Sequence, residues 1–241
     1  MTRVWLSLSV LLLAAACGGP KAPAAPPELK STDFALLPCA PSTAEAPCVF
    51  IAAGGKRLLA GAPPGIRASL AADPAMAANI DAVLLFSLQG AHVEGLDEVR
   101  NTTWTAGRET PLPVAGPSGT RDLLAALNKA FELSDAQVFV QSRPKGGFDA
   151  ALLGLLPGEG DAKTVVFDTG DLVVTKLETA AGMAGYWVDY GGARAVLQPC
   201  GMDQAVRFGG EADAVLACEG EAAWPLADLH YILQGADPEE S

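Results

Sequence analysis

The sequence predicts a layered sandwich of the α+β class, in which sheets and helices share one core. Half of the 241 residues are apolar, which is enough to bury one substantial core. Strand-like apolar runs occur in both halves of the chain, and segments with helical apolar spacing lie between them. Because an all-β fold would lack these helical segments, we expect packed layers of strands and helices.

The first half begins with two strands and continues with helices and strands in alternation. Gly54 and Gly55 separate two apolar runs, a pattern typical of a tight hairpin. Residues 82–86 read AVLLF, and a run without a polar face is typical of a strand buried on both sides. The remaining elements expected here are a helix over 66–79 interrupted by Pro74, a helix start at 95–100, a strand at 111–115 and a helix from about Thr120.

The second half carries signals of antiparallel pairing. Two strands flank Thr169-Gly170, and two more flank Gly191-Gly192. A strand over 212–219 and a last helix over 225–233 complete the expected order. The aromatic residues Trp104, Tyr186, Trp187, Tyr190 and Trp224 are scattered along the chain, and we expect them to serve as core or hairpin partners.

The N-terminus follows the order of a secretory signal. Arg3 precedes an apolar run from Val4 to Leu13, and small alanines then lead to Cys17. This pattern resembles the lipobox of bacterial lipoproteins, in which the cysteine becomes the lipidated first residue. We therefore expect a lipoprotein signal peptide over 1–16, with an ordinary signal peptide as the alternative. The run is shorter than the roughly 20 residues of a membrane-spanning helix.

Composition and charge suggest where the protein acts. Residues 17–35 are rich in Pro and Ala, as in an extended tether, and residues 36–241 are expected to fold. Together with the lipidated cysteine, this predicts a protein of the bacterial cell envelope, anchored to a membrane by its lipid and either periplasmic or surface-exposed. The net charge of −12 argues against nucleic acid as a partner.

The remaining four cysteines fall into two pairs. Cys39 and Cys48 lie in one neighbourhood, and Cys200 and Cys218 lie in another. Outside the cytoplasm such pairs predict two local disulfides. A zinc site built from all four is the weaker alternative, because neither pair has the spacing of a zinc knuckle.

Four motifs occur in an informative order: "GGKRLLAGAPPGI", "DAVLLFSLQGAHVEGLDEVRNTTW", "PLPVAGPSGTRDLLAAL" and "GYWVDYGGARAVLQPCG". Together they resemble the metallo-β-lactamase superfamily, most of all its ribonuclease Z-like branch. The resemblance spans Pro47 to Glu219. It implies an αββα sandwich of four layers, shortened at its C-terminal end, where the family supplies one more strand and a final histidine.

The resemblance also implies that the zinc ligands of the family have been lost. In the family a "THLHxDHxxGL" loop binds two zinc ions that generate a hydroxide nucleophile. Here the three histidines of that motif fall on Ser87, Gln89 and His92, and its aspartate falls on Ala91. A further family aspartate falls on Cys200. The family loop "DAGPG" reads "GAPPG", with glycine in place of the acid.

The whole chain contains two histidines, His92 and His230, fewer than a two-zinc site of the family needs. We therefore expect no cofactor, no catalytic residue and a non-catalytic binding or scaffolding role toward an unknown protein or small-molecule ligand. The alternative is an atypical metallo-hydrolase that binds one zinc ion near His92 and Cys200, with Glu94 or Asp97 as a carboxylate ligand. That alternative requires a free thiolate at Cys200.

Three further motifs have chemical and structural interpretations. Asp168-Thr169-Gly170 matches the aspartic protease triad, but it occurs once, and a turn between two strands explains it. Ser87 lacks the G-x-S-x-G elbow that exposes a nucleophilic serine. The glycines of "AGPSGTRD" precede a helix and could hold an anion, although the family uses this loop structurally.

Overall fold

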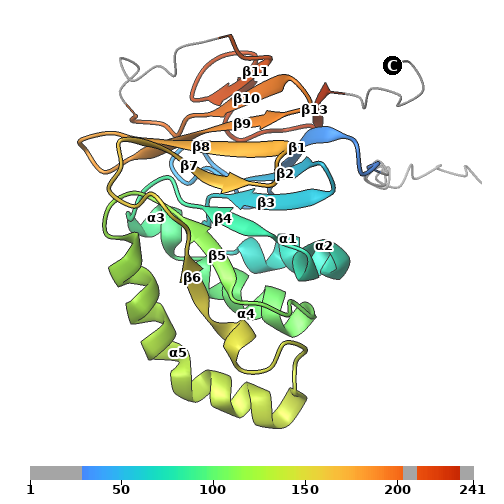
Figure 1. Ribbon diagram of the computed structural model, residues 1–241, viewed down its shortest axis with the longest axis vertical. Helices are drawn as coiled ribbons and strands as arrows, with labels where there is room; N and C mark the ends of the chain where they lie inside the picture. Colours follow the sequence, from blue (N-terminus) through green and yellow to red (C-terminus); the bar gives the residue numbers. More distant parts are fainter. Residues whose placement is uncertain (1–28, 203–210, 234–241) are drawn as a thin grey trace, which may run out of the picture.

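The computed structural model describes residues 29–202 and 211–233. The expected signal peptide and Cys17 lie outside these residues. Two β-sheets pack face to face, and the helices cover the outer side of one of them (Figure 1). This arrangement confirms the predicted α+β class.

In the described part of the chain, the first sheet has seven strands in the order β13-β1-β2-β3-β4-β5-β6. Strands β1 to β3 are antiparallel, and β3 to β6 run parallel to one another. The strands are β1 (Phe34–Pro38), β2 (Val49–Ala53), β3 (Lys56–Ala60), β4 (Ala82–Leu84), β5 (Leu112–Ala115), β6 (Leu153–Leu155) and β13 (His230–Leu233). The sheet thus begins at Phe34, two residues inside the stretch expected to form the tether.

The second sheet has six strands in the order β12-β11-β10-β9-β8-β7, again counting described residues. The predicted hairpins about Thr169-Gly170 and Gly191-Gly192 are confirmed, because β7 pairs with β8 and β9 with β10 in antiparallel register. The strands are β7 (Lys163–Asp168), β8 (Leu172–Glu178), β9 (Ala184–Tyr190), β10 (Ala193–Leu197), β11 (Ala214–Ala217) and β12 (Ala222–Ala223).

The helices come from the segments between β3 and β6. Pro74 divides the predicted helix over 66–79 into two, and the Asp73 side chain caps the second by accepting a hydrogen bond from the Met76 amide. The helices are α1 (Ile66–Ala72), α2 (Pro74–Ala78), α3 (Gly90–Val93), α4 (Leu96–Ala106), α5 (Thr120–Ser142) and a short 3-10 helix (Asp149–Ala151). Over residues 29–202 and 211–233, no helix has both the length and the hydropathy to cross a membrane.

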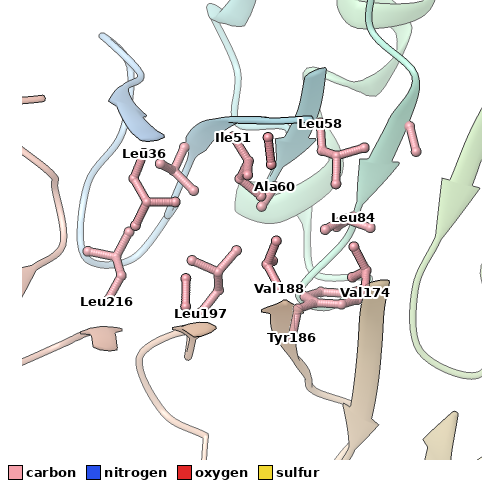
Figure 2. Packing of buried hydrophobic residues seen from close by; sticks show 14 of the residues in the cluster. Leu36, Ile51, Leu58, Ala60, Leu84, Val174, Tyr186, Val188, Leu197 and Leu216 are labelled. Carbon is pink, nitrogen blue, oxygen red and sulfur yellow. The ribbon is translucent and has the colours of Figure 1, made fainter. Parts of the chain in front are cut away.

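The first sheet is buried on both faces, as the apolar run in β4 predicted. Leu84 faces the second sheet, and Figure 2 shows it among the side chains that fill the space between the sheets. Val83 faces the opposite way and packs into the cluster that contains Ile66 of α1 and Leu124 of α5. The first sheet therefore divides the apolar interior into a layer between the sheets and a layer beneath the helices.

The last helix predicted over 225–233 is wrong. Residues 230–233 form β13, which pairs with β1 in antiparallel register, with Tyr231 opposite Ala35. The free edge of β1 offers backbone hydrogen bonds that a helix of this length could not match. Among described residues, all helices consequently cover the first sheet, and the second helical layer of the expected αββα sandwich is not seen (Figure 1).

A buried ion pair fastens α5 to α4. Both Nη atoms of Arg100 lie 2.9 Å from Oδ1 of Asp135, and Nη2 lies 3.0 Å from Oδ2. The guanidinium also donates to the carbonyl of Ala151 at 3.1 Å. Arg100 is 1 % exposed and Asp135 is 3 % exposed, so water does not replace either partner.

We predict that Arg100→Met destabilises the protein by about 3–5 kcal/mol, because it leaves the Asp135 carboxylate buried without its partner. Urea unfolding followed by circular dichroism measures the loss. The double variant Arg100→Met/Asp135→Leu should recover most of it, since both charges are then gone. Arg121→Met is the matched control: its pair with Glu159 is solvent-exposed on the arginine side, and its loss should cost less than about 1 kcal/mol. Equal losses in the two single variants would contradict the assignment.

Candidate functional site

The loop from β4 to α3 carries the positions that correspond to the zinc motif. Its backbone is held by both sheets: the Gly61 amide donates to the carbonyl of Leu84 at 2.8 Å, and the Ala184 amide of β9 donates to that of Phe86 at 2.7 Å. The Tyr186 hydroxyl also donates to the carbonyl of Leu85 at 2.6 Å. The loop therefore occupies the seam where the two sheets meet.

The Ser87 side chain of this loop is hydrogen-bonded to the ring of His92, which lies in α3. Nε2 of His92 lies 2.9 Å from the carbonyl oxygen of Glu45, which can only accept, so Nε2 carries the proton. Nδ1 then accepts the Ser87 hydroxyl at 2.6 Å. The Ser87 oxygen accepts in turn from the Gln89 amide at 3.1 Å. Both ring nitrogens are thus engaged, and the network is closed.

Burial keeps the His92 ring neutral. Ser87 is 2 % exposed and His92 is 4 % exposed. Desolvation lowers the pKa of His92 below its ordinary value of 6.5, and the hydrogen bond to the Glu45 carbonyl opposes this effect more weakly. The ring therefore acts as one donor and one acceptor between two neighbours.

A disulfide-closed loop covers this network. Cys39 and Cys48 are bonded, with Cα atoms 5.5 Å apart, and Ser42 accepts the Cys48 amide inside the loop at 3.0 Å. The loop places the Glu45 carbonyl against His92. Its end lies against Gly61, the residue that follows β3, because a Cβ added at Gly61 would lie 1.9 Å from the Pro47 carbonyl oxygen.

Gly61 occupies the position where the resembling family has an acid, and the structure explains the glycine. Its φ is +80°, in the left-handed region that favours glycine, and the Pro47 backbone fills the space of a side chain. The next residue, Ala62, donates its amide to the His92 carbonyl at 3.2 Å and accepts from the Gly95 amide at 2.9 Å. This loop therefore packs directly on the start of α3 and α4.

Aromatic side chains fill the seam beside the motif. The Phe86 ring lies 5.6 Å from that of Trp224, 5.9 Å from that of Tyr186 and 6.5 Å from that of His92, centroid to centroid. Trp224 is fixed by its indole N–H, which donates to the Gln198 carbonyl at 2.8 Å. Sequence reasoning treated these aromatics as scattered, because their neighbourhood depends on pairing between distant strands.

The remaining motif positions supply no pair of metal donors. Gln89 and Ala91 are exposed, and an alanine methyl group binds no metal. Cys200 is joined to Cys218, with Cα atoms 5.2 Å apart, and packs against the apolar layer between the sheets. Both predicted disulfides are therefore present, and in this state Cys200 has no thiolate to offer.

The donor set does not fit a zinc ion of the family type. Zinc in proteins is bound by thiolate, imidazole nitrogen and carboxylate, and each imidazole ligand needs one free ring nitrogen. Asp97 lies elsewhere, beside Arg67 and Arg100 in a hollow at α4 and α5. Within the described ranges, no group of three or more His, Cys, Asp or Glu residues is arranged to hold a metal ion.

The Asp168-Thr169-Gly170 motif forms the turn between β7 and β8. The Asp168 carboxylate accepts the Gly170 amide at 2.7 Å, and the Thr169 hydroxyl donates to Asp171 at 2.7 Å. These bonds hold the backbone of a two-strand turn, in agreement with the structural interpretation of the motif.

The glycine loop before α5 and the start of α5 already bind carboxylate side chains of the protein itself. One oxygen of Glu178 accepts both the Ser118 amide and the Ser118 hydroxyl, each at 2.7 Å. Glu159 accepts the Arg121 amide at 2.7 Å. The amides that could have held a phosphate therefore contact carboxylates of the second half of the chain.

Part of the chain is similar in sequence to known proteins. No family model matches the chain. Ribonuclease Z of Mycobacterium bovis (strain BCG) is 35% identical over 88 residues, which are 35% of this chain and 31% of that protein. Ribonuclease Z of Mycobacterium marinum is 36% identical over 88 residues, or 35% and 32% of the two chains. The chain thus spans about a third of the length of the curated relatives it matches.

Solved structures agree in fold. The short form of human tRNase Z superposes with a TM-score of 0.54 at 18% identity, covering 76% of each chain. YhfI of Bacillus subtilis superposes with a TM-score of 0.52 at 13% identity, covering 76% of this chain and 70% of that one. The protein has a metallo-β-lactamase fold. The sequence relatives named above are ribonucleases Z, which confirms the predicted resemblance to the ribonuclease Z-like branch.

We predict that the neutral state of His92 makes stability depend on pH. The unfolded chain binds a proton at His92 near pH 6.5, whereas the folded chain binds it at lower pH. This contribution is therefore fully present above pH 6.5 and is lost as the pH falls toward the folded pKa. In His92→Gln, this part of the pH dependence should disappear.

Urea unfolding of both proteins between about pH 5 and about pH 8 measures the effect as a difference, which cancels the titration of the carboxylates. The free-energy gap between wild type and His92→Gln should narrow as the pH falls. A gap that widens on acidification would show that the folded protein holds His92 protonated.

Proposed function

We propose that this chain is a non-catalytic binding or scaffolding protein of the bacterial cell envelope, held to a membrane by a lipid at Cys17. One observation supports the non-catalytic role. The histidine that remains from the metal motif, His92, uses both ring nitrogens in a buried network with Ser87 and the Glu45 carbonyl. A histidine that would bind zinc in the resembling family therefore forms part of a buried hydrogen-bond network here.

Hydrolysis in this fold depends on a metal that lowers the pKa of its bound water and polarises the substrate. Neither a serine hydroxyl, a glutamine amide nor an alanine methyl supplies that effect. Ser87 and His92 do form a nucleophile–base pair in outline. Yet the Ser87 side chain is 2 % exposed, so a substrate carbonyl has no open approach to its oxygen.

The anchoring half of the proposal rests on the order of residues at the N-terminus. The apolar run followed by small residues and Cys17 resembles a lipobox, and the stretch after it is rich in Pro and Ala. Two disulfides in the folded domain are consistent with an oxidising compartment outside the cytoplasm.

For the ligand, we propose only a chemical class. A protein or small molecule is favoured over nucleic acid because the chain carries a net charge of −12, which repels phosphates. Because the sequence relatives are ribonucleases Z, a direct binding assay with RNA at low salt tests this preference. The alternative function, an atypical metallo-hydrolase, requires reduction of the Cys200–Cys218 disulfide before Cys200 can bind a metal ion.

We predict that the chain, purified untagged and without chelator, contains less than about a tenth of an equivalent of zinc, because its motif side chains are poor or occupied donors. Metal content by mass spectrometry and a thiol count after denaturation measure this together. Ser87→His/Gln89→His/Ala91→Asp, which restores the motif beside His92, is the matched control and should take up more zinc than the wild type. Close to one equivalent of zinc in the wild type, lost in His92→Ala, would establish the metallo-hydrolase alternative.

We also predict that Cys17 carries lipid. Expression of the full chain in a bacterium with a labelled fatty acid should label the wild type and leave Cys17→Ser unlabelled, since thioether and amide acylation both require that cysteine at the mature N-terminus. The wild type should sediment with membranes. An unlabelled wild type recovered in the soluble fraction would favour the ordinary signal peptide, and label retained in Cys17→Ser would place the lipid on another residue.

A further inference from the structure

Arg108 is a buried cation whose described partners are all neutral. It lies between α4 and β5 and is 4 % exposed. Its Nε donates to the Thr103 hydroxyl at 3.0 Å, its Nη2 donates to the Arg100 carbonyl at 3.3 Å, and its Nη1 donates to the Thr110 carbonyl. Among the described residues, no carboxylate forms an ion pair with this guanidinium. Buried charges in proteins are normally paired, so Arg108 has the capacity to bind an anion.

The guanidinium also has hydrogen-bond donors left for an anion. An arginine side chain carries one N–H on Nε and two on each Nη. The three bonds above use one N–H on each nitrogen, so within the described part of the chain each Nη retains one. Desolvation lowers the pKa of Arg108 to about 10, and the charge of Arg100 acts in the same direction. The side chain is thus charged at neutral pH, and a bound anion would offset both effects.

Arg108 lines an open hollow together with two further cations. The hollow has a volume of about 450 Å³, and its charged lining residues are Lys56, Arg57, Asp81, Arg108 and Glu109. Asp81 is already engaged, because it accepts from the Arg57 amide at 2.8 Å and from Nζ of Lys56 at 3.4 Å. The Arg57 guanidinium forms no ion pair with a described residue. Cations therefore outnumber carboxylates here, in a chain whose net charge is −12.

The sheet brings these segments together from distant parts of the sequence. Arg57 lies at the start of β3, Asp81 directly precedes β4, and Arg108 lies shortly before β5. Because β3, β4 and β5 are parallel, their starts share one edge of the sheet. Alternation along β3 places Arg57 on the same face as Leu59, which packs beneath the helices. Ser87 follows the end of β4, so its loop lies at the opposite edge.

We propose that this hollow binds a phosphate group between Arg108, Arg57 and Lys56. Guanidinium groups suit phosphate because their N–H groups can bind its oxygens in pairs, and lysine adds a point charge. The overall charge of −12 disfavours a polyanion such as nucleic acid, whereas a single phosphate responds mainly to charges within about 8 Å at physiological salt. The site is separate from the loop of Ser87, so the proposal holds whether or not that loop binds a metal.

The phosphate can belong to a soluble compound or to a lipid headgroup. The chain enters the fold beside the hollow, because a Cβ added at Gly55, which lines it, would lie 3.9 Å from Cβ of Ser31. A lipid at Cys17 would leave at most about 50 Å of extended chain between the membrane and Ser31. The lipid source thus rests on the proposed anchor, while the soluble source does not, and each needs its own probe.

Isothermal titration of the full chain with inorganic phosphate, at constant ionic strength, tests the site itself. We expect a dissociation constant on the order of a millimolar for the wild type. Arg57→Gln should weaken binding about tenfold, because it removes a charge-assisted hydrogen bond. Arg108→Lys, which keeps the charge and loses the planar fork, should weaken it as well. Lys129→Gln is the matched control: its side chain is 81 % exposed on α5, and its variant should bind as the wild type does.

Flotation with phosphatidylglycerol vesicles tests the lipid source. Cys17→Ser and Cys17→Ser/Arg57→Gln share the same N-terminus, so a difference between them reports the hollow alone. Weaker flotation of the double variant assigns a lipid headgroup, and equal flotation together with phosphate binding that Arg57→Gln weakens assigns a soluble compound. Equal melting temperatures of wild type and Arg57→Gln without phosphate show that the fold is kept. The proposal is overturned if neither probe binds, or if Arg57→Gln binds both probes as strongly as its parent.

Discussion

The seam between the two sheets fixes the position of the loop that follows β4. Phe86 follows β4 into that seam, where its carbonyl accepts the Ala184 amide of β9 and its ring contacts Trp224. The carbonyl of Leu85 accepts the Tyr186 hydroxyl. These contacts use backbone and apolar groups, so they hold the loop in place whatever side chains follow. The fold can therefore keep the loop of a metal site after the ligands have changed.

The hydrogen bonds of His92 have the same pattern as those of a metal-ligating histidine, with a hydroxyl in place of the ion. A ligand histidine gives one ring nitrogen to the ion and fixes the other by a hydrogen bond. Here the Ser87 hydroxyl takes the place of the ion at Nδ1, while the Glu45 carbonyl accepts from Nε2. The ring remains fully satisfied in a site where desolvation disfavours its charged form. Its retention thus has a structural cause that requires no catalytic role.

The sequence predicted local features and missed contacts between distant segments. The glycine hairpins, the strand β4 and the break at Pro74 follow from patterns within a few residues, and the two disulfides join cysteines only 9 and 18 residues apart. The helix predicted over 225–233 failed because the edge of β1, almost 200 residues earlier in the chain, pairs with that segment instead. The absence of zinc-ligand residue types at Ser87, Gln89 and Ala91 is a feature of the sequence itself, and a metal-free site remains a prediction. The Glu45 carbonyl that completes the network could not be predicted, because a backbone acceptor leaves no trace in residue identity.

Two parts of the molecule can be compared as places for partner binding: the region around His92 and the outer face of α5. Around His92, the Cys39–Cys48 loop and the tight approach of Pro47 to Gly61 have closed the region that would correspond to the family's cleft. On α5, apolar side chains remain exposed although the helix is held firmly by Leu124 and by the Arg100–Asp135 pair. A face that is not needed for packing, yet carries Leu133 and Val140 in a packing pattern, costs solubility unless something covers it. The outer face of α5 is therefore a stronger candidate for partner binding than the buried network of Ser87 and His92.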